Sequence, residues 1–496
     1  MNGSLTMKKY AFLLLLVTIF TACNNPGGRR WIIPVNIDPS DLSYTPAQLE
    51  RFRIRRDQVL SNLEEGYVIL RSNDAGNDDY YDFRPNNYFY YLTGYDASNS
   101  YAILSNEDDY PFTMSLPPQN IRMMIYTGEP LPAEQVQELF RPDRLISYGE
   151  FRTLLDSILQ TGAPVYMDRS DRIFYNDLVS WVGEEGVTEF RNVGTLVDEL
   201  RVIKGSFEVE RLQKACDITS RAITNVLKEC SPGMYEFEME SIIEGTFLQY
   251  GADRSGFPSI VGSGPNSTIL HYEVNTRMME NGDLLLMDIG AEYGYYTADI
   301  TRTIPVNGRF NKEQQTIYQL VLDAQKAAIG LLKPGNMIWD GNKAAKEVII
   351  DGLFTLGLMT DSSSTWQSSF YILYPSSHYL GMEVHDVGDY GSYPMAHHGA
   401  PGADNEGRVL EPGMVLTIEP GLYFRERGLE QLYEIYGHRT DSTEIAAFID
   451  QVGPIYEKYI NIGVRIEDDI LITKDGNINL SRYAPKEIQD IEQIMR

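Results

Sequence analysis

Two aspartates within one apolar segment constrain the fold of this chain more than any other feature. Residues 284–304 read Leu-Leu-Leu-Met-Asp-Ile-Gly-Ala-Glu-Tyr-Gly-Tyr-Tyr-Thr-Ala-Asp-Ile-Thr-Arg-Thr-Ile. The two apolar runs flank Tyr293-Gly294, so the pattern predicts a hairpin with a two-residue turn there. In that register Asp288 lies directly opposite Asp299, with the two Cβ atoms roughly 4.5–5.5 Å apart. Like charges placed in this way are destabilising, and we therefore expect a cation between them.

Two glutamates near the C-terminus lie in similarly apolar strand patterns. Glu419 ends an apolar run just before a Pro-Gly turn, and Glu467 alternates with apolar residues. A buried carboxylate is costly unless a cation balances it, so each glutamate requires an arginine or a metal ion. For Glu467, a salt bridge with Arg465 on the same strand face is one interpretation. A shared metal ion is the other.

The histidines favour the metal interpretation. All six lie between His271 and His438, in the half of the chain that carries these four acids. Four carboxylates and one imidazole form a ligand set that suits Mn²⁺, Co²⁺ or Zn²⁺. Four negative charges also balance two divalent cations, which together can activate a water molecule for attack. The pattern therefore predicts metal-assisted hydrolysis.

Length and element order predict two folded domains. A chain of 496 residues is too long for one ordinary core. Strand and helix patterns alternate over residues 46–190, which is typical of a compact α/β domain. Residues 191–496 show the order helix, helix, paired strands twice, and this suggests a duplicated architecture. We expect an α/β (α+β) protein.

The net charge limits the possible partners. The formal charge is −28 at pH 7. Nucleic acids bind basic surfaces, so we expect no nucleic-acid partner, and the same charge disfavours electrostatic binding to anionic lipid.

Residues 1–22 have the pattern of an export signal. Lys8-Lys9 precede an apolar run that is long enough for a signal peptide and too short to span a membrane comfortably. The run ends in Phe-Thr-Ala-Cys23, which resembles a bacterial lipoprotein signal, although Leu is usual where Phe20 stands. Cleavage by the ordinary secretory peptidase is the alternative.

This signal predicts where the protein resides. Residues 23–45 are rich in Pro and Gly and predict a linker. We expect an exported bacterial protein, in the periplasm or at the outer membrane as a lipoprotein. Its contact with the membrane would be made only by lipid attached to Cys23.

Further sequence blocks carry a family resemblance. They are Met287-Asp-Ile-Gly290, Ala298-Asp-Ile-Thr-Arg-Thr303, His378-Tyr-Leu-Gly-Met-Glu-Val-His-Asp-Val-Gly388, Glu411-Pro-Gly-Met-Val-Leu-Thr-Ile-Glu-Pro-Gly-Leu-Tyr423 and Ile462-Gly-Val-Arg-Ile-Glu-Asp468. Together they resemble the pita-bread metallopeptidases, and among these the aminopeptidase P and prolidase branch. Asp82-Phe-Arg-Pro and Tyr90-Tyr-Leu-Thr-Gly-Tyr95 are similar to that branch's first domain. The resemblance implies a pita-bread catalytic domain preceded by a smaller creatinase-type α/β domain.

The resemblance assigns metal ligands. It implies that Asp288 chelates one divalent ion and that Asp299 and Glu467 bridge two ions. His378 and Glu419 would each complete the second site. Mn²⁺ is the first choice of metal, with Co²⁺ or Zn²⁺ as alternatives.

The resemblance also assigns catalytic roles. Glu419 would act as the general acid/base that moves a proton to the leaving proline nitrogen. His271 and His385 would bind the substrate carbonyl and steady the tetrahedral intermediate. Arg465 would orient the metal-bridging carboxylates from behind.

The implied activity is that of an Xaa-Pro aminopeptidase, acting on peptides with proline in the second position and assembled as a homodimer or homotetramer. An Xaa-Pro dipeptidase with the same metals is the alternative. A non-catalytic, membrane-tethered binding protein on the same scaffold is a more remote one.

Three features depart from the resemblance. Tyr374 stands four residues before His378, where that branch often has a histidine. Residues 424–461 predict an insertion near the site that alters access or oligomer contacts. The tandem His397-His398 matches no ligand position, and we expect it in a surface loop.

Overall fold

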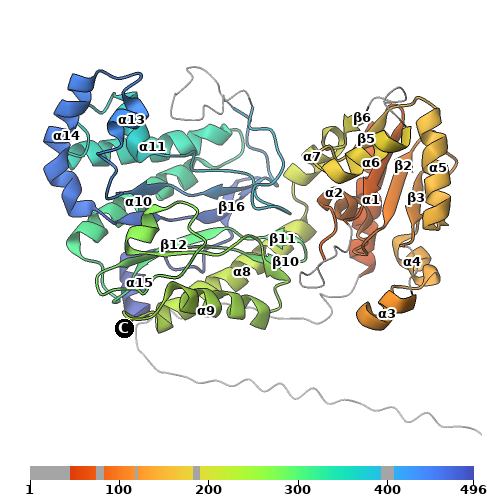
Figure 1. Ribbon diagram of the computed structural model, residues 1–496, viewed down its shortest axis with the longest axis horizontal. Coiled ribbons are helices and arrows are strands. Elements are labelled where there is room, and N and C mark those ends of the chain that lie inside the picture. Colours follow the sequence, from red (N-terminus) through yellow and green to blue (C-terminus); the bar gives the residue numbers. More distant parts are fainter. Residues whose placement is uncertain (1–44, 74–82, 118–120, 183–189, 392–406) are drawn as a thin grey trace, which may run out of the picture. The chain divides into compact units, whose positions relative to one another are not determined.

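The structure is a computed structural model that describes residues 45–73, 83–117, 121–182, 190–391 and 407–496 (Figure 1). The expected export signal, Cys23 and nearly all of the expected linker lie outside the described residues, as do His397 and His398. No helix in the described ranges has both the length and the apolar character needed to cross a membrane.

The N-terminal part of the described chain is built on a mixed six-stranded sheet. Its strands are β1 (Tyr67–Arg71), β2 (Tyr101–Ser105), β3 (Phe112–Ser115), β4 (Arg144–Ile146), β5 (Val165–Met167) and β6 (Phe190–Asn192). They follow the order β4-β3-β2-β1-β5-β6, and β1 pairs antiparallel with β2 but parallel with β5. The helices of this part are α1 (Pro46–Asn62), α2 (Asn87–Thr93), α3 (Ile121–Thr127), α4 (Ala133–Phe140), α5 (Tyr148–Gln160) and α6 (Arg172–Val182).

Local sequence determines where helices of this part begin. Thr45 and Gln48 bond reciprocally at the start of α1, and Pro46 occupies the first turn, where no N–H is needed. Ser147 and Glu150 make the same reciprocal pair at the start of α5.

The C-terminal part contains the remaining strands and helices (Figure 1). The strands are β7 (Arg254–Ser255), β8 (Ile260–Ser263), β9 (Leu284–Ile289), β10 (Ala291–Tyr293), β11 (Tyr296–Thr297), β12 (Ile300–Pro305), β13 (Val415–Ile418), β14 (Gly421–Tyr423), β15 (Gly463–Arg465), β16 (Asp468–Thr473) and β17 (Gly476–Asn479). The helices are α7 (Gly194–Val202), α8 (Ser206–Glu229), α9 (Glu236–Gln249), α10 (Lys312–Leu331), α11 (Ile338–Thr355), α12 (Thr365–Tyr371), α13 (Leu432–Tyr436), α14 (Ser442–Tyr456) and α15 (Ile488–Ile494), with 3₁₀ turns η3 (Gly264–Thr268) and η4 (Glu457–Tyr459).

Helix pairs cover small antiparallel sheets in this part. Two of the sheets have the orders β12-β9-β8 and β13-β16-β17. Helices α8 and α9 precede the first sheet and α10 and α11 precede the second, which confirms the predicted repetition of element order. Helix α8 contacts β10, β11 and β12, whereas α10 contacts β13, β14 and β15. Every residue of β12 and β13 is buried.

The predicted hairpin forms, but its turn is one residue later than predicted. Tyr293 pairs with Tyr296, so the turn residues are Gly294 and Tyr295, with φ of 56° and 71°. A two-residue turn of this kind needs positive φ at both central positions, and glycine supplies the first at little cost. At the second central position, the ring of Tyr295 lies 3.8 Å from the ring of Tyr90, measured between centroids. This contact helps to hold the positive φ of Tyr295.

The shift changes the partner of Asp288. Thr301, not Asp299, lies opposite Asp288 in the ladder. The predicted direct opposition of the two aspartates is therefore wrong. Asp299 lies two residues before Thr301, so the two aspartates are diagonal neighbours on one face of the sheet. Diagonal neighbours are still within reach of a shared cation.

The 424–461 segment forms α13, α14 and η4 and packs on α12. Phe448 of α14 lies 5.0 Å from Trp366 and 6.3 Å from Phe370, measured between ring centroids. The Trp366 indole N–H donates to Glu444 at 2.6 Å. The segment therefore supports the helix that leads directly into the loop of Tyr374 and His378. His438 is exposed on this segment.

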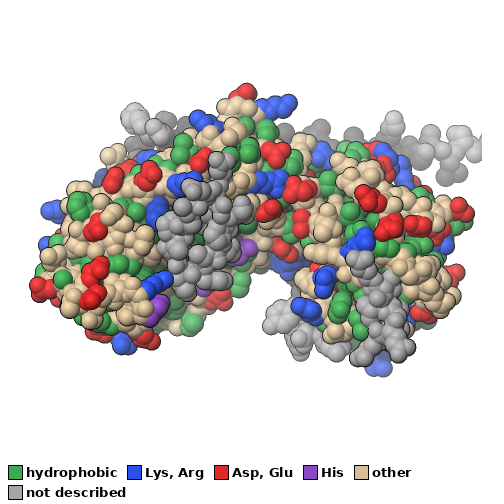
Figure 2. Space-filling view, turned by 90° about the horizontal axis from the view of Figure 1, so that it is seen from above, with side chains coloured by type: hydrophobic (Ala, Val, Ile, Leu, Met, Phe, Trp, Pro, Cys, Tyr) green, Lys and Arg blue, Asp and Glu red, His purple; other side chains and the backbone are tan. Residues whose placement is uncertain are grey.

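Acidic and basic side chains are interspersed on the face seen in Figure 2. Among the described residues of that face, the basic side chains do not merge into one continuous area.

Candidate metal centre

Five separate strand ends and loops carry the predicted ligands. Asp288 is in β9, Asp299 immediately precedes β12, His378 follows α12, Glu419 immediately follows β13, and Glu467 lies between β15 and β16. Backbone hydrogen bonds join these segments. The Glu467 N–H donates to the Thr301 carbonyl at 3.1 Å, and the Thr417 N–H donates to the His378 carbonyl at 2.9 Å.

The imidazole of His378 marks where these side chains converge. Its Nε2 atom lies 3.4 Å from Asp299 Oδ2, 3.5 Å from Glu419 Oε1 and 4.0 Å from Glu467 Oε1. One ligand atom from each of Asp299, His378 and Glu467 falls within 4.8 Å of the other two.

Several carboxylate oxygens in this cluster are buried without a hydrogen-bond donor. They are Asp288 Oδ1, Asp299 Oδ1 and Glu467 Oε1. Asp299 is 4% exposed and Glu467 is 1% exposed. A buried carboxylate oxygen without a donor is costly, and a cation removes that cost. These oxygens and the imidazole nitrogen therefore fit divalent metal ions.

The electrostatics of the cluster also favour a cation. Burial raises the pKa of Asp299 well above its usual range, and the nearby Asp288 and Asp469 carboxylates raise it further. Burial and the Asp299 carboxylate raise the pKa of Glu467 in the same way. Burial raises the pKa of Glu419 to about 7. In the metal-free protein these groups hold protons that a bound cation would displace.

The orientation of His378 suits metal binding. Its Nδ1 atom lies 3.0 Å from the Tyr379 carbonyl oxygen, which can only accept a hydrogen bond. Nδ1 therefore carries a proton, and Nε2 is the ring nitrogen that faces the carboxylates and is available to a metal ion.

Arg465 contacts the cluster through Asp288, whereas the sequence suggested a salt bridge with Glu467. Its Nη2 atom donates to Asp288 Oδ2 at 2.5 Å, so the alternative of a salt bridge between Arg465 and Glu467 is replaced by a pair with Asp288. Its Nε atom donates to the Thr301 hydroxyl at 3.0 Å, and that hydroxyl donates to Glu467 Oε2 at 2.7 Å. Arg465 thus reaches Glu467 only through Thr301.

The two other predicted histidines lie beside this cluster. The rings of His385 and His378 are 4.5 Å apart and nearly perpendicular. Partial burial lowers the pKa of His385, and His378 and His271 lower it further, so His385 is a neutral donor near pH 7. His271 is exposed in the loop after η3.

Sequence reasoning missed Asp469. Its Oδ2 atom accepts the backbone N–H of Asp299 at 3.1 Å and the thiol of Cys216 at 3.1 Å. It is fully buried, and burial raises its pKa to about 7. The sequence does contain a sign of this role. Asp469 is the third acid in the run Glu467-Asp-Asp469, which lies among apolar strand residues, and a buried carboxylate there needs a hydrogen-bond donor or a cation.

The arrangement can bind divalent metal ions, activate water and transfer a proton. Buried acids with raised pKa values beside imidazole side chains are typical of sites for metal-assisted hydrolysis.

The chain matches two described protein families. Residues 210–474 match Metallopeptidase family M24, and residues 52–166 match the aminopeptidase P N-terminal domain. The matched ranges fall inside the predicted domains 191–496 and 46–190.

Relatives of known name match nearly the whole chain. It is 33% identical over 458 residues to the Xaa-Pro aminopeptidase of Haemophilus influenzae, covering 90% of this chain and 97% of that protein. It is 31% identical over 471 residues to the Xaa-Pro aminopeptidase of Escherichia coli, with the same coverage of 90% and 97%.

Solved structures are similar over the same extent. The aminopeptidase PepP of Pseudomonas aeruginosa superposes with a TM-score of 0.76 at 29% identity, covering 90% of this chain and 98% of that one. Escherichia coli aminopeptidase P with the inhibitor Pro-Leu gives a TM-score of 0.75 at 30% identity, also covering 90% and 98%. The pita-bread fold expected from the sequence is therefore confirmed, and the chain belongs to metallopeptidase family M24, in its aminopeptidase P branch.

Proposed function

We propose that this chain is an Xaa-Pro aminopeptidase, which removes the N-terminal residue of a peptide when proline follows it. The observation that carries the proposal is the convergence of four carboxylates and His378, with buried oxygens that lack hydrogen-bond donors. The activity named for the relatives in Haemophilus influenzae and Escherichia coli supports the same substrate class.

Two divalent ions, with Mn²⁺ as the first choice, would be held by Asp288, Asp299, His378, Glu419 and Glu467. Four carboxylates balance the charge of two such ions, and oxygen donors with one nitrogen suit Mn²⁺. Ions bound there would polarise the scissile carbonyl and make water acidic enough to attack near neutral pH.

The protein's own side chains would handle the proton and the developing charge. Glu419, whose pKa burial raises to about 7, can accept a proton from the attacking water and deliver it to the leaving proline nitrogen. His385 and His271 would donate hydrogen bonds to the substrate carbonyl oxygen as negative charge develops there. Arg465 would keep Asp288 in place.

The test compares peptides that differ only at the second residue. We expect the Mn²⁺-loaded protein to release the first residue from Xaa-Pro-Yaa-Yaa and not from Xaa-Ala-Yaa-Yaa, followed by chromatography of the products. Equal cleavage of both peptides would contradict the assignment of proline specificity. Cleavage of the dipeptide Xaa-Pro alone would favour the Xaa-Pro dipeptidase. Fewer than one bound ion per chain after Mn²⁺ loading, without any hydrolysis, would favour the binding protein.

We propose further that the protein is an exported bacterial lipoprotein anchored through Cys23, in the periplasm or at the outer membrane. Lys8-Lys9, the apolar run and the Thr-Ala-Cys23 ending support this localisation. Labelling of growing cells with radioactive palmitate should mark the wild-type chain and not Cys23→Ser. Labelling of both chains would exclude Cys23 as the anchor.

For the assembled protein we propose a homodimer or homotetramer. Light scattering of the protein eluting from a size-exclusion column measures its mass directly. A mass of about one chain, 56.3 kDa, at micromolar concentration would contradict this proposal.

A further inference from the structure

Hydrogen bonds through two tyrosines connect two of the candidate metal ligands. Arg465, which donates to Asp288, also donates from Nη1 to the Tyr423 hydroxyl at 2.8 Å. The hydroxyl oxygens of Tyr423 and Tyr374 are 2.7 Å apart. The Tyr374 hydroxyl in turn donates to the backbone carbonyl of Glu419 at 3.2 Å. These contacts form a continuous path from Asp288 to Glu419.

The chemistry of the groups gives this path a direction. An arginine can only donate a hydrogen bond, and a carbonyl oxygen can only accept one. The single hydroxyl hydrogen of Tyr374 is therefore directed at Glu419. Tyr423 must then donate its own hydrogen to Tyr374 while it accepts one from Arg465. Each hydroxyl donates one bond and accepts another, so the loss of either hydroxyl interrupts the path.

Glycine at position 421 makes room for the two hydroxyls. A Cβ atom there would lie 2.5 Å from the Tyr423 hydroxyl oxygen and 2.8 Å from that of Tyr374. Tyr423 is only 4% exposed, and hydrogen bonds in such surroundings are stronger than bonds in water.

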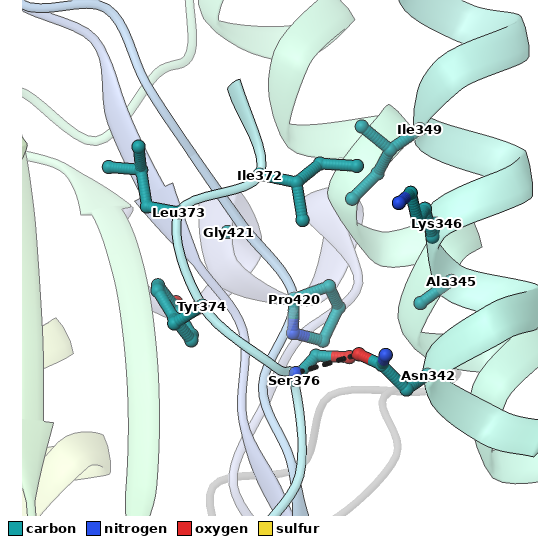
Figure 3. A pocket seen from close by; sticks show the side chains of 10 residues that line it. All are labelled: Asn342, Ala345, Lys346, Ile349, Ile372, Leu373, Tyr374, Ser376, Pro420 and Gly421. Carbon is teal, nitrogen blue, oxygen red and sulfur yellow. Dashed lines mark hydrogen bonds between the residues drawn. The ribbon is translucent and has the colours of Figure 1, made fainter. Parts of the chain in front are cut away.

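The segment that carries Tyr374 holds the Glu419 backbone from both sides. The Glu419 N–H donates to the Ser376 carbonyl at 2.9 Å, while its own carbonyl accepts from Tyr374. Ser376 is fixed in turn, because its N–H and its hydroxyl both reach Asn342 Oδ1 on α11, at 2.9 and 3.0 Å. Figure 3 shows this segment running past Pro420, with the Ser376–Asn342 bonds dashed.

We propose that Tyr374 and Tyr423 are positioning residues that couple the placement of Glu419 to that of Asp288. Neither hydroxyl needs to touch substrate. Tyr374 fixes the backbone from which the Glu419 carboxyl extends, and Tyr423 fixes the guanidinium that holds Asp288. The effect on turnover rests on the proposed peptidase function, whereas the effect on metal binding does not.

The first test removes the Tyr374 hydroxyl alone. In Tyr374→Phe, we expect kcat to fall about tenfold with KM within about twofold of wild type, because contacts behind metal ligands typically affect activity or metal affinity 10- to 100-fold. The matched control is Tyr371→Phe, which removes a hydroxyl that donates to the Leu358 carbonyl at 2.7 Å, away from the ligands. A merely structural role would lower the melting temperature in both variants and leave kcat unchanged in both.

The second test measures Mn²⁺ binding to the metal-free protein by calorimetry, independently of catalysis. We expect Tyr423→Phe to weaken Mn²⁺ binding about tenfold or more and Tyr371→Phe to leave it within about twofold. The double variant with Tyr374→Phe should bind Mn²⁺ no more weakly than the worse single variant, because both changes interrupt one path.

Two results would overturn the proposal. One is Mn²⁺ affinity within twofold of wild type in both single variants, and the other is full additivity in the double variant. If Tyr374→Phe fails to fold, Gly421→Ala tests the same path, because the added methyl group would displace both hydroxyls. Unchanged Mn²⁺ affinity in Gly421→Ala would also contradict the proposal. A wild-type protein that binds Mn²⁺ but cleaves no peptide would refute only the peptidase function.

Discussion

Asp299 illustrates the electrostatic demand that the site places on a single residue. The residue is 4% exposed and its Oδ1 atom lacks a hydrogen-bond donor, while Asp288 and Asp469 lie close enough to raise its pKa. Its backbone N–H donates to Asp469 Oδ2 at 3.1 Å, and its Oδ2 atom lies 3.4 Å from His378 Nε2. A residue in such surroundings is held by the fold in a position that only a cation makes favourable.

Arg465 provides a sharp test at this scale. Its three nitrogens bond to Thr301, Tyr423 and Asp288, a planar pattern that a lysine cannot reproduce. We expect Arg465→Lys to weaken Mn²⁺ binding by about 10- to 100-fold. Isothermal titration calorimetry of the metal-free protein measures the change.

The control for Arg465→Lys is the same substitution on the surface. Arg427 is 74% exposed and pairs with Glu430 at 3.0 Å. Exposed ion pairs contribute little, so Arg427→Lys should leave Mn²⁺ affinity unchanged. Equal effects of the two substitutions would show that Arg465 has no special role.

At the scale of elements, the hairpin turn determines how the two aspartates meet. Gly294 and Tyr295 both have positive φ, and a side chain at position 294 would add strain. Its Cβ would also lie 2.9 Å from Arg211 Nε. We expect Gly294→Ala to lower the free energy of unfolding by about 1–2 kcal/mol, which is the cost of left-handed backbone for an L-residue.

A helical glycine supplies the control for Gly294→Ala. Gly330 lies in α10, and a Cβ there would meet no atom within 4 Å. Gly330→Ala should raise stability by about 0.5–1 kcal/mol. Urea denaturation measures both variants, and a Gly294→Ala protein as stable as wild type would contradict the turn assignment.

Much of the site could be predicted because buried acids stand out in apolar strands. Asp288, Asp299, Glu419 and Glu467 each interrupt such a run, and His378 lies in a block that the family resemblance identifies. The hairpin register could not be predicted with equal success, because a shift of one residue depends on backbone angles at Gly294 and on a distant ring contact.

Other residues gain their meaning only in three dimensions. Asp469 supports Asp299 from another strand, and nothing in the local sequence distinguishes it from the neighbouring Asp468, which pairs with Arg302. The hydroxyl pair of Tyr374 and Tyr423 joins residues that are far apart in the sequence. Tyr374 was visible in the sequence only as a departure from the family pattern.

At the scale of the whole molecule, metal binding and folding stability are linked through pH. Without metal, the raised pKa values of Asp299, Glu467 and Glu419 mean that the folded chain holds protons that the unfolded chain releases. This contribution stabilises the metal-free fold at low pH and is lost as pH rises toward about 7, the pKa of Glu419.

The same linkage predicts how Mn²⁺ acts. Because Mn²⁺ must displace those protons, its apparent affinity should rise from pH 5.5 to pH 8. Each tenfold gain in affinity adds about 1.4 kcal/mol at saturating metal, or roughly 2–4 °C in melting temperature. Scanning calorimetry should therefore show a larger Mn²⁺-induced shift at pH 8. An equal or smaller shift at pH 8 would contradict the raised pKa values.

The measurement that tests the central claim most directly is the number of Mn²⁺ ions bound per chain. After removal of metal and reloading, mass spectrometry of metal content should give about two ions for the wild-type protein, because four carboxylates balance two divalent charges. Asp299→Ala, which removes an acid at the centre of the cluster, should bind one ion or none. Fewer than one ion in the wild-type protein, or an unchanged count in Asp299→Ala, would contradict the account.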